Sequence, residues 1–166
     1  PELKESGLRE VFEDIDRPHI DVLARMERHG VAIDVGVLTE LGAQLAQEIA
    51  VAEAEVYGSV GHEFQIGSPQ QLSQILFEEL ELPKTRKTRT GWTTDANALD
   101  VLRGVHPVVE AVLRWRELTK LKSTYVDTLP GQVNPRTGRV HTVYSQVTAA
   151  TGPVTSTHLT LPTTCT

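Results

Sequence analysis

The segment from Trp115 to Tyr125 reads Trp-Arg-Glu-Leu-Thr-Lys-Leu-Lys-Ser-Thr-Tyr, and its pattern predicts the C-terminal end of a long amphipathic helix. Apolar side chains recur at helical spacing, whereas cations occupy other faces of the helix. The apolar set is Val108, Val112, Trp115, Leu118 and Leu121, and the cations are Arg114, Arg116, Lys120 and Lys122. Two interpretations are open: a solvated helix face, or lysines and hydroxyls that bind a phosphate backbone.

The N-terminal part of the chain carries the same helical period. A first helix is predicted over residues 8–29, interrupted or restarted at Pro18 and ended by Gly30 as a C-terminal cap. Asp34 is placed as the N-cap of a second helix. The apolar stripe of that second helix predicts antiparallel packing on a neighbouring helix, and it consists of Leu38, Leu41, Leu45, Ile49, Ala52 and Val56.

Three further helix starts follow from capping signals. Ser68 precedes a proline and has a glutamine three residues later, which predicts a third helix that ends at Pro83. Thr94 is the predicted N-cap of a short helix closed by Gly104, and His106 with the proline after it begins the long helix. The sequence therefore predicts a mainly α-helical unit.

Between these helices lies a basic loop from Lys84 to Thr94, with four Lys/Arg and no acidic residue. Cations, hydroxyls, a glycine and one aromatic ring suit contact with a sugar-phosphate backbone without base reading. A solvated loop between helices is the equally weighted alternative.

Charge is divided unevenly along the chain. Residues 1–83 hold five Lys/Arg against 17 Asp/Glu, whereas residues 84–166 hold 11 against five. The total of −6 therefore combines an acidic half with a basic half. Because local patches set the field that a polyanion meets, the second half is where DNA or RNA is expected to bind.

After Tyr125 the hydrophobic period changes from 3.6 to 2. A break at Leu129 and a turn at residues 134–138 precede an alternation typical of a strand, Val140, Thr142, Tyr144 and Gln146. The residues from Thr148 onward are rich in threonine and poor in apolar residues, too little to complete a sheet domain.

Bulk composition excludes several classes of protein. The chain has 39% hydrophobic and 23% charged residues, which is ordinary for a soluble protein. It has no long apolar run and its first twenty residues are acidic, so we expect a cytoplasmic protein without membrane contact. A single cysteine, Cys165, and six scattered histidines predict neither a disulfide nor a zinc site.

Several motifs, in order along residues 8–152, resemble the bacterial DNA polymerase I family, the A-family polymerases. The motifs are Lys120–Tyr125 with Asp127, Leu129 and Pro130; Pro135–Thr142; Thr148–Gly152; Val22–Glu27 with Gly30 and Asp34; Gly67–Leu72; and Lys87–Thr94.

The resemblance implies a domain plan. Residues 1–29 would end an exonuclease-like domain, 30–128 would form the helical thumb, and 129–152 would be the first strands of an incomplete α+β palm. The tail at 153–166 is atypical and is expected to be disordered. The resemblance also implies contacts of the thumb and palm with the primer–template duplex, made by Lys87, Thr88, Arg89, Thr93, Thr94, Lys120, Lys122, Ser123, Thr124, Gln146, Thr148 and Thr151.

Two departures limit what the chain itself is expected to do. The family follows its Thr-Gly pair with Arg-Leu-Ser-Ser, whereas this chain has Pro153-Val154-Thr155-Ser156, so we expect the sequence from about residue 153 not to be authentic family sequence. No Asp or Glu follows Asp127, and two-metal phosphoryl transfer needs carboxylates. We therefore expect a polymerase fragment that is inactive and holds no cofactor, from a parent that uses two Mg²⁺ ions and deoxynucleotides.

The expected partner of the fragment is double-stranded primer–template DNA, which it would bind as a monomer. Two other classes remain as alternatives: a non-catalytic helical DNA-binding or scaffold module, and a purely structural helical protein. The structural alternative predicts no duplex binding even at low salt.

Overall fold

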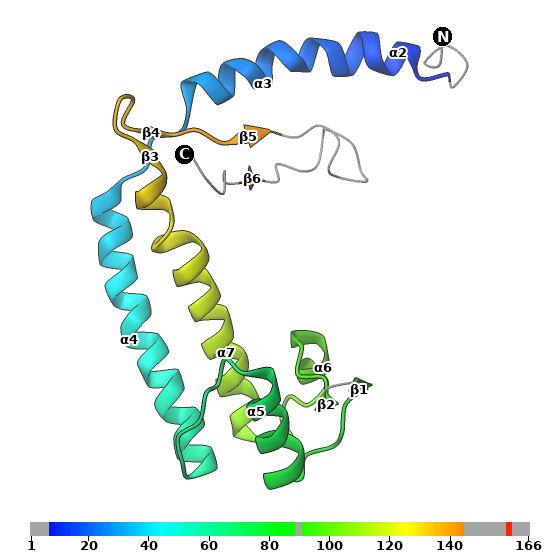
Figure 1. Cartoon of the computed structure of the whole chain (residues 1–166), viewed down its shortest axis with the longest axis vertical. Helices are drawn as coiled ribbons and strands as arrows, with labels where there is room; N and C mark the ends of the chain where they lie inside the picture. The colour runs from blue at the N-terminus through cyan, green and yellow to red at the C-terminus, as the bar shows by residue number, and fades with distance from the viewer. Residues whose placement is uncertain (1–6, 89–90, 145–158, 161–166) are drawn as a thin grey trace. The chain divides into compact units, whose positions relative to one another are not determined.

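The computed structural model describes residues 7–88, 91–144 and 159–160, and the chain divides into two compact units (Figure 1). Unit 1 combines residues 1–34 with 129–166, and unit 2 is the continuous stretch Val35–Thr128. The prediction of a mainly α-helical chain with a few short strands is confirmed.

Unit 2 is built on two long antiparallel helices, α4 (Val35–Val60) and α7 (Pro107–Leu121). The predicted stripe of α4 faces inward: Leu45, Ala52 and Val56 are buried, and the other three members are half-buried. Helix α7 begins as predicted, because His106 Nδ1 accepts a hydrogen bond from the Val108 amide at 3.2 Å. Periodicity and capping chemistry thus place both helices correctly.

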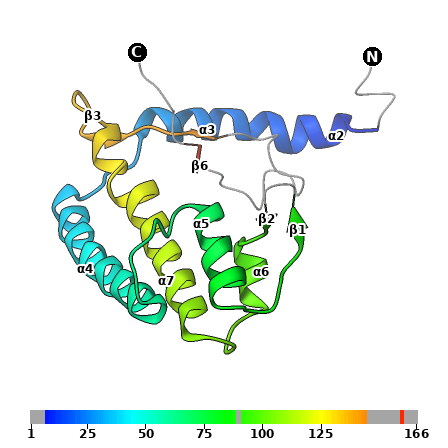
Figure 2. The same cartoon turned by 60° about the horizontal axis from the view of Figure 1, so that its bottom comes forward.

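Short elements cover the other side of α7. Figure 2 shows α4 on one side of α7, and α5 (Pro69–Gln74) and α6 (Ala96–Asp100) on the other. A π-helical turn, η2 (Ile75–Glu79), continues α5, and the two-residue strands β1 (Lys87–Thr88) and β2 (Gly91–Trp92) pair antiparallel. The core between these elements is apolar and contains Val56, Ile66, Leu72, Leu76, Phe77, Leu82, Leu99, Leu102, Val108, Val109, Ala111 and Val112.

The third helix ends earlier than predicted. Its N-terminus follows the prediction, since Ser68 Oγ accepts from the Gln71 amide. It stops at Glu79 rather than at Pro83, because Glu81 takes a left-handed φ of 49° and the Leu82 amide donates back to the Leu76 carbonyl at 2.9 Å. This bond spans six positions, one more than the bond of a Schellman motif, and the left-handed residue before it ends the helix as in that motif, so a proline is not needed to end it.

Unit 1 joins segments from before and after unit 2. Its helical part is α2 (Arg9–Val11), the π turn η1 (Phe12–Asp16) and α3 (Arg17–His29). The chain is not interrupted at Pro18, but α3 starts directly before it, in agreement with the restart that was the other predicted possibility. Pro18 lies in the first turn of α3, where its missing N–H is tolerated after the wider π turn.

After a 3₁₀ turn, η4 (Leu129–Gln132), the chain forms the pairs β3 (Val133–Asn134) with β4 (Arg139–Val140) and β5 (Val143–Tyr144) with β6 (Leu159–Thr160). The predicted alternation is present, because Val140 and Thr142 are buried and Val143 is exposed.

The two segments of unit 1 meet at Gly30. The Val31 amide donates to the Val140 carbonyl at 2.8 Å, and the Val140 amide donates to the Val31 carbonyl at 2.9 Å. His141 Nδ1 is 2.8 Å from the Glu27 carbonyl oxygen, and the Tyr144 amide donates to Glu27 Oε1 at 2.8 Å. The structure therefore groups residues 9–29 with the strands after residue 129 in one compact unit. The domain plan that the resemblance implies for these segments stays a prediction.

Candidate nucleic-acid interface

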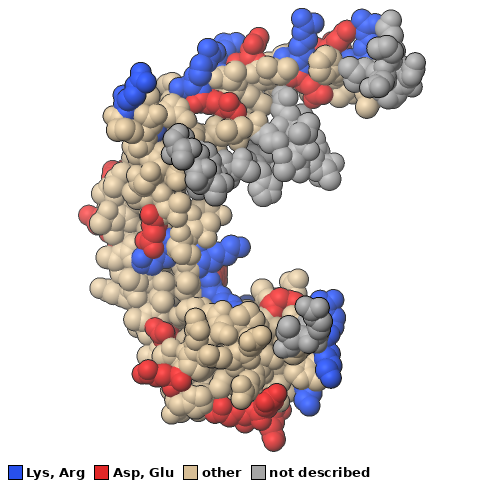
Figure 3. All heavy atoms as spheres, viewed as in Figure 1, with Lys and Arg blue, Asp and Glu red and all other residues tan. Residues whose placement is uncertain are grey.

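The basic segment after η2 is a two-stranded hairpin rather than a plain loop. Lys84, Arg86 and Lys87 are exposed on the hairpin. The hydroxyls of Thr85 and Thr93, in contrast, make hydrogen bonds within the protein. The Thr85 hydroxyl donates to the Thr93 carbonyl at 2.6 Å, and the Thr93 hydroxyl donates to Asp95 Oδ2 at 2.8 Å. Figure 3 shows Lys and Arg gathered along the side of unit 2 where this hairpin lies.

Trp92 anchors the hairpin to the core of unit 2. Its ring meets the Phe77 ring edge-on, with centroids 6.5 Å apart, and its amide donates to Ser73 Oγ at 3.2 Å. The ammonium nitrogens of Lys84 and Lys87 lie 5.5 and 5.8 Å from the ring centroid, within cation–π range. The hairpin thus presents two lysines that an aromatic ring holds in place.

Thr94 does not have the role predicted for it. It is buried, and the N-cap of α6 is Asp95, whose Oδ1 accepts from the Ala98 amide at 2.8 Å. Thr94 instead binds the guanidinium of Arg116, through its carbonyl oxygen and, at 3.4 Å, through its hydroxyl. Thr94 is therefore buried in unit 2 and is not an exposed hydroxyl of the hairpin, and its contact with DNA stays a prediction.

Both charged neighbours of Thr94 have shifted pKa values. The pKa of Asp95 lies below its usual value, mainly because the Ala98 N–H and then the Thr93 hydroxyl stabilise the carboxylate. Burial lowers the pKa of Arg116, and the nearby Asp95 charge partly opposes that shift. Arg116 is thus a half-buried structural cation at the middle of α7, which its position in a charged helix face did not indicate.

The cations predicted to form a positive face on α7 are mostly engaged within unit 2. Arg114 lies 3.8 Å from Glu48 and 3.9 Å from Glu55, both on α4. Lys122 donates to both carboxylate oxygens of Asp127 at 2.8 Å. Among the described residues, Lys120 is the exposed cation of this set without such a partner.

The end of the helix also differs from a regular α-helix. Residues Lys122–Val126 form a π turn, η3, and the side chains of Ser123 and Thr124 are exposed on it. Leu121, predicted to pack inward, is 41% exposed, and the helix widens directly after it. Lys120, Ser123 and Thr124 remain available for an external partner, one to two turns beyond Arg116.

Some predicted contact residues lie outside the part of the chain that the structure describes. These are Arg89, Gln146, Thr148 and Thr151, and for Thr88 the structure describes the backbone alone. Within the described residues, no group of three His, Cys, Asp or Glu could hold a metal ion. Among the helices described, none combines the length and apolar content that crossing a bilayer requires.

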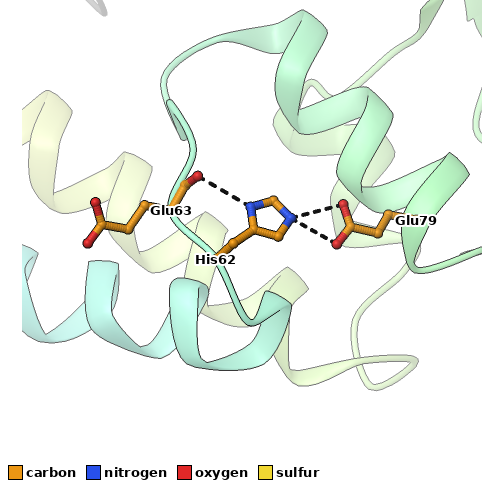
Figure 4. Close-up of polar contacts among 3 residues, drawn as sticks. All are labelled: His62, Glu63 and Glu79. Carbon is orange, nitrogen blue, oxygen red and sulfur yellow. Dashed lines mark hydrogen bonds and ion pairs between the residues drawn. The ribbon is translucent and has the colours of Figure 1, made fainter.

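A titratable pair lies at the far end of η2. His62 Nε2 is 2.9 Å from Glu79 Oε1, and His62 Nδ1 is 3.3 Å from the Glu63 carbonyl oxygen (Figure 4). Hydrogen bonding to the Glu63 carbonyl, and then to Glu79, raises the pKa of His62 above its ordinary value of 6.5.

This pair predicts a pH-dependent stability for unit 2. Because the folded-state pKa of His62 is raised, its contribution is complete below about pH 6.5 and is lost as pH rises through the folded value. We expect His62→Gln to lower the urea midpoint at about pH 5.5 and to leave it nearly unchanged at about pH 8.5. Glu79→Gln is the matched control, and equal effects of His62→Gln at both pH values would exclude the ion pair.

Comparison with known proteins shows to which family the chain belongs. Residues 35–163 match the family described as DNA polymerase family A, and the chain belongs to that family, as its motifs predicted. Its relatives include bacterial DNA polymerase I. It is 48% identical to the thermostable DNA polymerase I of Thermus aquaticus over 154 residues, which is 92% of this chain and 18% of that protein.

Two other matches agree. The chain is 45% identical to DNA polymerase I of Rhizobium leguminosarum, over 94% of this chain and 16% of that protein. A solved structure, the POL domain of Pol1 from M. smegmatis in complex with DNA primer–template and dNTP, superposes with a TM-score of 0.78 at 41% identity. That match covers 91% of this chain and 27% of the other. The chain thus spans less than a fifth of the length of these two curated relatives.

Proposed function

We propose that unit 2 is the thumb of a DNA-directed DNA polymerase and holds the primer–template duplex by its sugar-phosphate backbone. The observation that carries the proposal is the likeness to a polymerase domain whose structure contains primer–template DNA. Exposed cations and hydroxyls on unit 2 support it, namely Lys84, Arg86, Lys87, Lys120, Ser123 and Thr124. The cations neutralise phosphates, and the hydroxyls donate hydrogen bonds to phosphate oxygens. Neither contact reads the bases, so the same residues can hold a template of any sequence.

In the same proposal, the strands after residue 129 begin the palm, and Gln146, Thr148 and Thr151 lie near the primer and template strands. The whole protein would add deoxynucleotides to a primer end in replication and repair, with two Mg²⁺ ions. The residues described here offer no carboxylate cluster that fits those ions, and the last acidic residue, Asp127, is paired with Lys122. We assign no step of the reaction to this chain.

Fluorescence anisotropy of the full 166-residue chain on a labelled primer–template tests the binding proposal. We expect weak binding by a monomer, with an affinity that falls linearly with salt on a log–log plot. Equal affinity at low and high salt would contradict a backbone contact. Primer extension by the full-length protein tests the activity of the parent separately.

Individual lysines should differ in this assay. Lys120→Ala should reduce the slope of log affinity against log salt concentration by about 0.9 in magnitude, which is the value for one phosphate contact in B-form DNA. Lys122→Ala should reduce it less, because Asp127 already neutralises that ammonium group at 2.8 Å.

The matched control for this prediction is Arg103→Ala. It removes one positive charge that is paired with Asp100 at 2.7 Å on the surface of unit 2. If Arg103→Ala and Lys120→Ala change the slope equally, the effect is one of net charge and Lys120 does not meet the duplex.

A further inference from the structure

A cavity of about 420 Å³ opens on unit 2 beside Trp92. Its size falls within the range of pockets that take small organic ligands. Residues from α5, β2, the start of α6 and the middle of α7 line it: Pro69, Gln70, Ser73, Trp92, Thr93, Thr94, Asp95 and Arg116. One aromatic ring, one guanidinium and one carboxylate therefore share a single concave surface.

Arg116 keeps hydrogen-bonding capacity in this cavity. A guanidinium has five N–H donors, and the bonds that Arg116 makes within the described residues both go to Thr94. Among those residues no carboxylate forms an ion pair with it, although it is half-buried. A desolvated cation with unused donors beside an open cavity is a candidate for ligand binding.

Asp95 supplies the complementary acceptor. Its Oδ1 accepts from the Ala98 amide and its Oδ2 from the Thr93 hydroxyl, which leaves further lone pairs on both oxygens. A carboxylate in the cavity would repel a bare anion. The ligand should therefore present donors and acceptors side by side and carry any negative charge elsewhere.

A nucleobase has this chemistry. It is flat, it stacks on aromatic rings, and its edge carries adjacent donors and acceptors. The ammonium groups of Lys84 and Lys87, within 6 Å of the Trp92 centroid, lie where an attached phosphate would be neutralised. We propose that this cavity binds a single unpaired nucleotide, with its base against Trp92 and its edge toward Arg116 and Asp95.

The proposal rests on the proposed function only in that a nucleic-acid strand reaches unit 2, and it differs from duplex backbone binding because it needs an unpaired base. Tryptophan fluorescence can follow it. The chain contains two tryptophans, Trp92 and Trp115, so Trp115→Phe leaves Trp92 as the single reporter. Stacking of a base on Trp92 should quench its emission.

In the Trp115→Phe chain, we expect saturable quenching by deoxyguanosine monophosphate and tighter quenching by a short single-stranded oligodeoxynucleotide. A free nucleotide and a strand nucleotide are distinguished by these two arms. Arg116→Gln should weaken both about tenfold, the loss expected for one charge-assisted hydrogen bond. Circular dichroism checks that the variant folds; Gln70→Ala, at an exposed lining residue, is a second variant expected to weaken binding.

Three results would overturn the proposal. Absence of quenching by both ligands would exclude a base site at Trp92. Equal displacement by inorganic phosphate would reduce the cavity to a phosphate site. Equal competition by a blunt duplex without unpaired bases would assign the quenching to duplex binding at the hairpin, in which case the proposed function stands and the nucleotide site fails.

Discussion

Replacing Gly30 by alanine should destabilise unit 1 by about 3 kcal/mol, the upper range for a residue forced into a glycine-only backbone region. Gly30 has φ of 65° and ψ of 178°. A Cβ atom there would lie 2.9 Å from both the Val140 carbonyl oxygen and the His141 ring. The Val140 carbonyl cannot retreat without breaking the bridge between Val31 and Val140, and the His141 ring cannot retreat without losing its 2.8 Å contact with the Glu27 carbonyl oxygen.

Native-state hydrogen exchange measures this effect where it acts. The amides of Val31 and Val140 bond to each other's carbonyl oxygens, so their protection reports the bridge directly. A loss of about 3 kcal/mol corresponds to a fall in protection of about a hundredfold.

The matched control is Gly58→Ala. Gly58 lies within α4 and a Cβ atom there meets nothing within 4 Å, so alanine should stabilise α4 by about 0.5–1 kcal/mol. Unchanged protection of Val31 and Val140 in Gly30→Ala would show that the backbone relaxes at no cost.

Phe77→Ala should cost unit 2 about 3–5 kcal/mol, the range for truncating a buried phenylalanine. Phe77 is only 3% exposed, and its ring supports Trp92 from the core side. The loss is a large fraction of the stability of a typical domain. It should also loosen the β1–β2 hairpin, and with it weaken the duplex binding that we propose for unit 2.

Urea unfolding followed by tryptophan fluorescence is the measurement, because Trp92 and Trp115 both belong to unit 2. Phe77→Leu keeps most of the volume and should cost less than about 1.5 kcal/mol. If Phe77→Ala cost no more than Phe77→Leu, the ring would not be an essential part of the core.

The sequence predicted the helices well because their patterns are local. Period 3.6 fixed the buried face of α4, and His106 and Ser68 carried recognisable caps. Period 2 after Gly138 likewise matched the buried Val140 and Thr142. In these elements, residues a few positions apart decide the outcome, so a single sequence suffices.

The roles of the residues at the candidate interface were harder to predict from the sequence, because each role depends on a partner that is distant along the chain. Thr94 and Asp95 are both good N-cap residues, and the choice was decided by Arg116, 22 residues later, which holds Thr94. Lys122 is paired with Asp127, five positions on, which α-helical spacing does not bring together. The wider π turn of η3 does, since its hydrogen bonds span five residues.

Because unit 1 consists of two separate chain segments, it cannot complete its fold during synthesis until the second segment has been made. Val31 leaves the ribosome long before Val140, and the whole of unit 2, residues 35–128, is made in between. At about 5–20 residues per second, the helix before Gly30 would wait roughly 5–20 s for its strand partners. Unit 2 contains only contiguous sequence and can fold during that interval, so the order of translation favours unit 2 folding first.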